Sequence, residues 1–310
     1  MKQFSSKKYL LPLIIPAAAL MILAFLPSNN SGAGDAPHID QSSDLTGSFT
    51  ISGDPLVAPL SRVWAAEFMK LHPGVVITVV EDASSGIDAL SRGAAIYQSM
   101  PRLGPAGAET ASGIESNRIR IASDALSVIR WPWNPVELMT LEQVSGIYSG
   151  RIVNWKELGG LDEPIVVYAM PPGTPAYDFF KAKVLRLYGL PSADETIEFG
   201  SNVIFVRSAE EGNDLVAENP FAVFFTPVNI VTQEVTPTWI ARTAGKEPSK
   251  ACLETTSAGI FPIYRPLYYY TDGQPVGLVK EFIDFCLSEQ GQDMVMLGGY
   301  LRLFFPNLGP

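Results

Sequence analysis

Residues 140–160 read TLEQVSGIYSGRIVNWKELGG and describe a short helix followed by a tight turn. Thr140 carries the hydroxyl that suits an N-cap. The apolar side chains that follow recur at three- and four-residue spacing: Leu141, Val144, Ile147 and Tyr148. Ser149 and Gly150 are typical of a helix end, and Trp155 is expected to anchor the next turn to the body. This stretch therefore predicts a helix that buries one face against a core.

The composition indicates a large globular protein that is acidic. The chain has 310 residues, of which 47% are hydrophobic, enough to bury a substantial core in two lobes. Its net charge of −10 falls to −13 when residues 1–33, with three lysines and no acid, are removed. Such a charge disfavours nucleic-acid binding. Any bound anion must therefore be held by local donors rather than by the overall field.

The N-terminus has the pattern of a segment that directs export. Lys2, Lys7 and Lys8 precede an uncharged apolar run at residues 9–26, and small residues follow it. We therefore expect residues 1–33 to be a signal peptide or an N-terminal anchor, and residues 34–45 to be a flexible leader. Both alternatives predict a periplasmic or extracytoplasmic body. Membrane contact is then expected only through this segment, with residues 9–26 as the anchor if it is retained.

The chain contains two cysteines, Cys252 and Cys286. In an oxidising compartment they are compatible with one disulfide that closes the C-terminal segment. Two buried free thiols are an equal alternative.

Strand and helix patterns alternate from Gly47 onward, which predicts an α/β protein with buried sheets. The expected strands lie at 49–51, 75–80, 119–121, 125–129, 165–168, 203–206, 222–225 and 263–271. The expected helices lie at 55–71, 87–92, 176–187, 209–218 and 275–288.

The 140–160 stretch resembles the signature of the periplasmic phosphate-binding proteins of ABC transporters. Further matches are PLVAPL (55–60), WAAEF (64–68), HPGV (72–75), RPLYYYT (265–271), VKEFIDF (279–285) and SEQGQ (288–292). The resemblance spans about residues 47–308 and implies a type II periplasmic-binding-protein-like fold. In that fold each lobe is a central mixed sheet flanked by helices, and a two-crossing hinge joins the lobes. Lobe 1 is then 46–125 plus 258–310, and lobe 2 is 126–257.

The same resemblance implies a binding protein that captures phosphate or a related small oxyanion in an interlobe cleft. It also implies delivery to an ABC transporter permease. An enzyme is not expected, because the two histidines, His38 and His72, lie in the leader and at a helix stop. The sequence contains no nucleophile elbow, metal-ligand spacing or phosphate loop ending in Lys-Ser/Thr, and no cofactor is expected.

Two loops of lobe 1 are candidates for ligand contact. At 52–56 a strand meets a helix, with Asp54 as the N-cap and Pro55 in the first turn. Helix starts direct N–H groups such as that of Leu56 outward. Asp54 is equally compatible with a plain structural cap, and Pro55 removes one donor. The second loop carries Ser84, Ser85 and Gly86, and it matches the Ser/Gly-rich phosphate loop of the family.

A third candidate piece is SMPR at 99–102, which is similar to the family's Met-Ser-Arg. Arg102 is a natural bidentate partner for an oxyanion. Asp124 is expected to pair with Arg102, to accept a proton from a protonated anion, or to cap a hinge turn.

The second lobe matches the family least well at its ligand loop. Residues 177–180 fit the family's aromatic-acidic-Phe-Phe run. This alignment places Met170, Thr174, Pro175 and Ala176 where the family has Arg, Ser, Gly and Thr. Only Thr174 keeps a hydroxyl, and a buried dianion without donors is costly. The alternative is therefore a diverged module of the same fold that binds another ligand or a partner. The candidate ligand-binding residues are Asp54, Leu56, Ser84, Ser85, Gly86, Arg102, Asp124 and Thr174.

Overall fold

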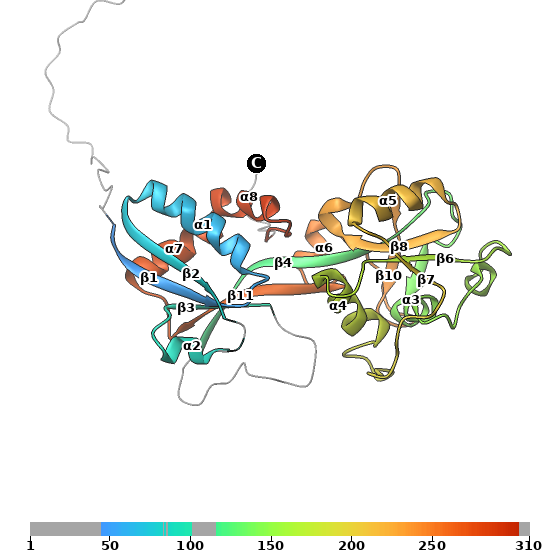
Figure 1. Ribbon diagram of the computed structural model, residues 1–310, viewed down its shortest axis with the longest axis horizontal. Coiled ribbons are helices and arrows are strands. Elements are labelled where there is room, and N and C mark those ends of the chain that lie inside the picture. Colours follow the sequence, from blue (N-terminus) through green and yellow to red (C-terminus); the bar gives the residue numbers. More distant parts are fainter. Residues whose placement is uncertain (1–44, 83, 85, 101–115, 304–310) are drawn as a thin grey trace, which may run out of the picture. The chain divides into compact units, whose positions relative to one another are not determined.

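A computed structural model describes residues 45–303 of the chain, except residues 83, 85 and 101–115 (Figure 1). The expected signal peptide or anchor at 1–33 lies outside the described residues, as does the leader up to residue 44. Within the described part, no helix is both long enough and apolar enough to cross a bilayer.

The main sheet has the strand order β2-β1-β3-β11-β4-β8-β6-β7. Its first group consists of β1 (Thr46–Gly53), β2 (Gly74–Glu81), β3 (Ile96–Ser99), β4 (Ser116–Arg130) and β11 (Tyr264–Asp272). In this group β1, β2 and β3 are parallel, while β11 runs antiparallel to both β3 and β4. The helices of this group are α1 (Ala58–Leu71), α2 (Asp88–Ser91), α7 (Gly277–Leu287) and α8 (Glu289–Leu297).

The strands β4 and β11 continue side by side from the first group of strands to the second (Figure 1). Along β4 lies β8 (Ala222–Pro227), antiparallel, followed by β6 (Val166–Ala169) and β7 (Val203–Phe205), both parallel to their neighbours. Three short strands complete this part: β5 (Leu138–Thr140), β9 (Thr236–Pro237) and β10 (Trp239–Ala241). Its helices are α3 (Leu141–Tyr148), η1 (Trp155–Leu158), α4 (Pro175–Phe180), η2 (Lys181–Leu185), α5 (Ala209–Glu218), η3 (Val228–Ile230) and α6 (Leu253–Ser257).

Separate hydrophobic clusters stabilise the two groups of strands. In the first group the helices α1, α7 and α8 cover the sheet, and Trp64 donates to the carbonyl of Gly291 at 2.7 Å. In the second group β8 is buried on both faces, since Phe225 packs with α3 and α4 while Phe224 packs with α5. Burial on both faces agrees with the expected buried sheets. The lobe bounds, 46–125 plus 258–310 and 126–257, stay a prediction.

The stretch at 140–160 folds as its sequence predicts. Thr140 accepts the N–H of Gln143 at 3.1 Å, and the Gln143 side chain accepts the N–H of Thr140 at 2.8 Å, which is a capping box. The four apolar side chains of the stripe are buried. Gly150 has a φ of +76°, and the Trp155 indole donates to the carbonyl of Phe221 at 2.9 Å. Both the helix and its anchor are therefore confirmed.

Several expected elements differ in the structure. The two strands expected at 119–121 and 125–129 are one strand, β4, because β11 pairs with its residues 116–125 and β8 pairs with its residues 126–130. The helix expected at 176–187 changes from α to π at Lys181. β2 lies at the edge of the sheet, so Val76 and Val80 are exposed rather than buried. Helix α8 is absent from the sequence prediction.

Both cysteines are free thiols. Cys286 is buried beside Phe282 in the first cluster, and Cys252 precedes α6, where it lies near Thr255. The structure therefore favours the alternative of two free thiols over the disulfide.

Candidate functional site

Three parallel strands bring the predicted ligand loops of the first group to one edge of the sheet. Gly53 of β1 pairs with Glu81 of β2 and with Gln98 of β3. The carboxyl ends of such strands are where open α/β sheets bind their ligands. The loops with Asp54 and Leu56 and with Ser84 and Gly86 therefore begin side by side. Ser85 and Arg102 lie outside the described residues.

The turn after β1 is built differently from the prediction. Helix α1 begins at Ala58 with Val57 as its N-cap, so the assignment of Asp54 as the N-cap and Pro55 to the first turn is wrong. The reason is a tight turn, in which the Asp54 carbonyl accepts the N–H groups of Val57 at 3.1 Å and Ala58 at 3.2 Å. Asp54 Oδ1 accepts the N–H of Leu56 at 2.9 Å. The donor expected to face a ligand is therefore engaged within the protein.

Gly53 makes the close approach of this turn to β3 possible. Its φ is +138°, and a Cβ atom at this position would lie 2.2 Å from the carbonyl oxygen of Gln98. The next residue, Asp54, is buried and donates its N–H to that same oxygen at 2.9 Å. The turn at Gly53 and Asp54, where the candidate site begins, is thereby held against β3.

The loop after β2 holds its serine through a neighbouring carboxylate. Ser84 is exposed, and its Oγ and N–H donate to Asp82 Oδ1 at 2.7 and 3.2 Å. Gly86 adopts a φ of +54°, and the helix α2 that follows has four residues. A ligand that takes the Ser84 hydroxyl must therefore replace the bond to Asp82. Ligand contact by Ser84 and Gly86 stays a prediction.

A buried ion pair joins the two strands that cross between the groups. Asp124 of β4 and Arg265 of β11 are register partners, and Arg265 Nε and Nη2 lie 2.8 and 2.7 Å from Asp124 Oδ2. Their side chains are only 13% and 12% exposed. The guanidinium carbon also lies 4.4 Å from the centre of the Phe179 ring on α4. Arg265 therefore links the crossing strands to the second group.

Of the three alternatives predicted for Asp124, the structure contradicts the hinge-turn cap, while pairing with Arg102 and acceptance of a proton stay predictions. The residue lies within β4 and does not cap a hinge turn, because its strand continues to Arg130. Its partner among the described residues is Arg265, which the sequence analysis did not select as a site residue. The available signal was one arginine at the start of the aromatic strand RPLYYYT.

Tyr300 completes a group of polar side chains at this point. Its hydroxyl donates to the carbonyl of Leu56. The pKa of Tyr300 is raised to about 12, mainly by burial of the phenol. The carboxylates of Asp124 and Asp54 also raise this pKa, and the Arg265 guanidinium opposes them. Asp54, Asp124, Arg265 and Tyr300 therefore share one electrostatic environment, and we name them the crossing cluster.

Groups of this kind suit binding better than proton transfer. The Tyr300 phenol, with a pKa of about 12, keeps its hydrogen at neutral pH, and the Arg265 guanidinium offers several N–H donors in a fixed geometry. A general acid or base works best when its pKa lies near the working pH. Among the described residues, no group of three or more His, Cys, Asp or Glu side chains is placed to hold a metal ion.

In the second group Thr174 is the N-cap of α4. Its hydroxyl accepts the N–H of Tyr177 at 3.3 Å and donates to the carbonyl of Pro171 at 2.8 Å. Met170 packs against the hydrophobic clusters on both faces of the sheet. A ligand contact by Thr174 therefore requires sharing this cap, and it stays a prediction.

Comparison with known proteins places these features in a family. The model of the PBP superfamily domain matches residues 31–290. The phosphate-binding protein PstS of Bacillus subtilis (strain 168) is 27% identical over 303 residues, which cover 95% of this chain and 94% of that protein.

Two solved structures agree with this assignment. An ABC-type phosphate transport receptor from Vibrio cholerae has a TM-score of 0.67 and 25% identity, covering 82% of this chain and 99% of that chain. A putative phosphate ABC transporter substrate-binding protein from Clostridium perfringens, solved with bound phosphate, has a TM-score of 0.51 and 28% identity. The match covers 83% of this chain and 100% of that chain. The chain therefore belongs to the PBP superfamily, with the periplasmic-binding-protein-like α/β fold that its sequence predicts.

Proposed function

We propose that this chain is an extracytoplasmic solute-binding protein that captures phosphate or a related small oxyanion for an ABC transporter. One observation carries the proposal: β1, β2 and β3 deliver their loops to one edge of a sheet whose family and fold are those of such receptors. Nearly full-length similarity to a phosphate-binding protein supports the same ligand class.

The ligand is proposed to lie where the loops of the first group approach the start of α4. The proposed contacts are Asp54, Leu56, Ser84, Ser85, Gly86, Arg102, Asp124 and Thr174. To these we add Arg265 as a proposed contact, because its guanidinium contacts both Asp124 of β4 and the Phe179 ring of α4. The chain is acidic, so an oxyanion must be held by these local N–H, O–H and guanidinium donors.

Two hydrogen bonds favour a second candidate, a diverged module that takes a less highly charged ligand. The N–H of Leu56 is engaged by the Asp54 carboxylate, and the hydroxyl of Thr174 donates to the carbonyl of Pro171. Both donors must be released or shared before they can serve a dianion. An uncharged or singly charged solute places a smaller demand on them.

The remaining parts of the proposal concern chemistry and location. The named relatives are binding proteins of transporters, and we propose that this chain likewise performs no catalysis. The body is proposed to lie outside the cytoplasm, with the apolar run at 9–26 either cleaved with the signal peptide or retained as an anchor. A permease is the proposed partner.

Thermal unfolding of the protein and of its variants, with one kind of anion added at a time, tests the proposed ligand contacts. Phosphate at about 100 times its Kd should stabilise the protein by about 2.7 kcal/mol and raise its Tm by several degrees. Ser84→Ala, Arg102→Gln and Thr174→Val should each reduce this shift. Ser192→Ala, which alters an exposed hydroxyl bonded to Glu142, should leave it unchanged. If no anion raises the Tm of the unmodified protein, oxyanion capture is wrong.

A further inference from the structure

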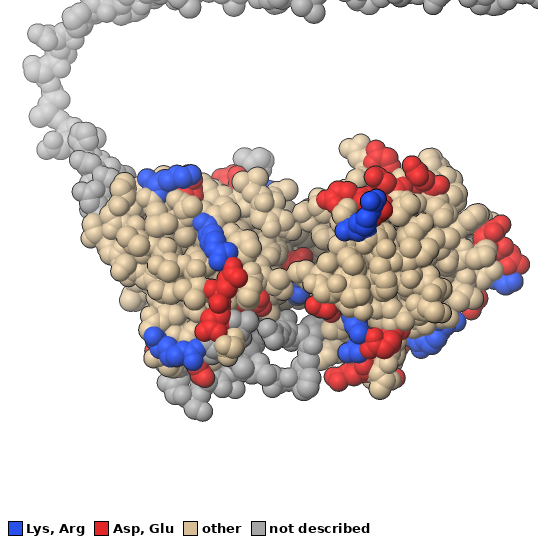
Figure 2. Space-filling view, viewed as in Figure 1, with Lys and Arg blue, Asp and Glu red and all other residues tan. Residues whose placement is uncertain are grey.

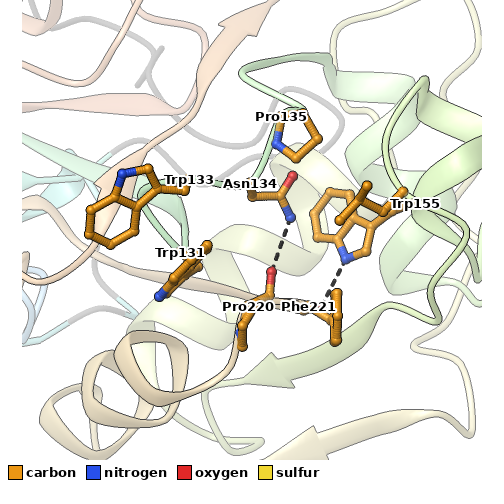
Figure 3. Close-up of a pocket in the computed structure, with 8 residues that line it drawn as sticks. Trp131, Trp133, Asn134, Pro135, Trp155, Pro220 and Phe221 are labelled. Atoms are coloured by element: carbon orange, nitrogen blue, oxygen red, sulfur yellow. Dashed lines mark hydrogen bonds between the residues drawn. The ribbon is translucent and has the colours of Figure 1, made fainter.

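A second surface with the features of a binding site follows the end of β4. Residues 131–135 read WPWNP, and Trp131, Trp133 and Pro135 form part of the wall of a cavity of about 30 Å³ (Figure 3). Leu161 and Pro220 contribute from other segments of the second group. We name this surface the tryptophan pocket. It is built from residues other than those of the crossing cluster.

Hydrogen bonds fix the segment of chain that lines the tryptophan pocket. The buried Asn134 amide donates to the Pro220 carbonyl at 3.3 Å and accepts the N–H of Val136 at 3.0 Å (Figure 3). Arg130 Nη1 donates to the carbonyls of Asn134 at 2.7 Å and Trp131 at 3.1 Å. The pocket is therefore preformed, and what it offers an occupant is chiefly apolar surface.

The walls of the pocket expose large apolar side chains that the core does not use. Trp133 is 75% exposed and Leu161 is 57% exposed. The rings of Trp131 and Trp133 lie 4.8 Å apart at an angle of 55°, which leaves ring surface open to a partner. Exposed apolar groups that cluster around a cavity are typical of an interaction site.

The volume of the cavity decides what kind of occupant fits. A cavity of about 30 Å³ has room for one or two water molecules, and small-molecule sites usually enclose about 300–1,000 Å³. The space fits the end of one apolar side chain or a prolyl ring. Aromatic walls of this kind dock extended proline-containing segments. The occupant is therefore a protein segment rather than a free solute.

The charges around the pocket decide which segment fits. Glu137 and Glu218 are exposed, and each lies two positions along the chain from a lining residue, Pro135 and Pro220. The Glu137 carboxylate also interacts with the buried guanidinium of Arg130. Acidic side chains gather over α5, which Glu218 ends (Figure 2). Asp162, beside Leu161, is paired with Lys156 at 2.8 Å. Exposed carboxylates therefore lie close along the chain to the lining segments, which favours a basic partner over an acidic one.

We infer that the tryptophan pocket docks an extended segment of a partner protein that carries one apolar or prolyl anchor flanked by lysine or arginine. A second copy of this chain is disfavoured, since its net charge of −10 would be repelled. An anionic lipid surface is disfavoured for the same reason. This inference does not depend on the ligand of the crossing cluster.

A labelled peptide of the sequence Lys-Lys-Pro-Leu-Pro-Lys-Lys tests the inference on the full-length protein by fluorescence anisotropy. We expect saturable binding that Trp133→Ala weakens about tenfold, because exposed aromatic anchors dominate such contacts. Added salt should weaken it further. Trp239→Ala, which removes an exposed tryptophan outside the pocket, should leave binding unchanged.

Two matched peptides and one vesicle complete the test. A peptide with serine in place of the leucine and of both prolines, and one with glutamate in place of lysine, should both bind at least about tenfold more weakly. The inference is overturned if the first peptide does not bind, or if Trp133→Ala binds it as tightly as the unmodified protein. It is also overturned if phosphatidylglycerol vesicles bind through Trp133 while the peptides do not.

Discussion

At the scale of single residues, the Asp124–Arg265 pair links the side chains of the two crossing strands. Both side chains are largely buried, and both nitrogen contacts converge on one carboxylate oxygen. Removing one partner from such a pair leaves an uncompensated charge in a region of low polarity, which costs more than the pair itself contributes.

Arg265→Gln is therefore expected to lower the free energy of unfolding by about 3 kcal/mol, because it strands the Asp124 carboxylate. Urea denaturation measures this change. The double variant Asp124→Asn, Arg265→Gln should recover a large part of the loss, since neither residue is then charged. If the loss of the double variant instead equals the sum of the losses of Asp124→Asn and Arg265→Gln measured separately, the two residues are not coupled.

Tyr300 gives the protein a dependence on alkaline pH whose sign follows from its raised pKa. The folded value of about 12 lies above the value near 10 of an unfolded tyrosine, so folding favours the protonated phenol. This contribution to stability is fully present below about pH 10 and is lost as the pH rises from about 10 to about 12.

Tyr300→Phe is accordingly expected to reduce stability at neutral pH by about 1 kcal/mol, through loss of the bond to Leu56. Above about pH 10 the variant should lose stability less steeply than the unmodified protein. Urea unfolding across this range, with Tyr168→Phe as the control, checks the slope. Parallel curves for Tyr300→Phe and the unmodified protein would contradict the assignment.

At the scale of elements, local sequence signals predicted a helix correctly where nearby side chains accept the N–H groups at its start. The capping box of Thr140 and Gln143, the buried stripe and the glycine stop all lie within α3 and its flanking residues. Helix α5 likewise has the predicted bounds, with Ser208 accepting the N–H of Glu211 at 3.2 Å. Such elements can be predicted because their stabilising partners are three or four residues away.

Thr140→Ala should destabilise the protein by about 1 kcal/mol, because the N–H of Gln143 then loses its acceptor. Thr140→Ser keeps a hydroxyl at the same place and should stay within about 0.5 kcal/mol of the unmodified protein. Urea denaturation of both variants measures the difference. Equal losses in the two variants would show that packing of the threonine methyl group, rather than the cap, stabilises this end.

The sequence did not predict an element correctly where its stabilising partners lie far away along the chain. Ser123 and Asp124 interrupt an apolar pattern and suggested a break in the strand, yet Arg265, 141 positions later, pairs with Asp124. Helix α8 begins with five residues that are polar or glycine, Glu289–Asp293, and its Gln292 donates to the carbonyl of Ile121 at 3.0 Å and to that of Cys286 at 2.8 Å. These polar residues are stabilised inside the fold by groups that no local pattern identifies.

The candidate site shows the same limit. Sequence analysis placed Asp54, Leu56 and Ser84 after predicted strands, and in the structure these segments do follow the parallel strands β1 and β2. It did not reveal that Asp54 engages the N–H of Leu56 or that Asp82 holds Ser84. Those bonds depend on the backbone geometry of tight turns, which residue types alone do not determine.

At the scale of the whole molecule, an acidic protein is proposed to bind an anion. The net charge of −10 opposes this, so affinity must come from a few oriented donors at strand ends and helix starts. Strand β4 belongs to both groups of strands, because it pairs with β11 in the first and with β8 in the second. Added salt is therefore expected to weaken phosphate binding little, in contrast to peptide binding at the tryptophan pocket.

Calorimetric titration of phosphate into the full-length protein, at low micromolar protein concentration, tests the central claim most directly. The account predicts saturable binding of one phosphate per chain, weakened by Arg102→Gln and unchanged by Trp133→Ala. Absence of heat together with absence of a thermal shift at millimolar phosphate would contradict oxyanion capture.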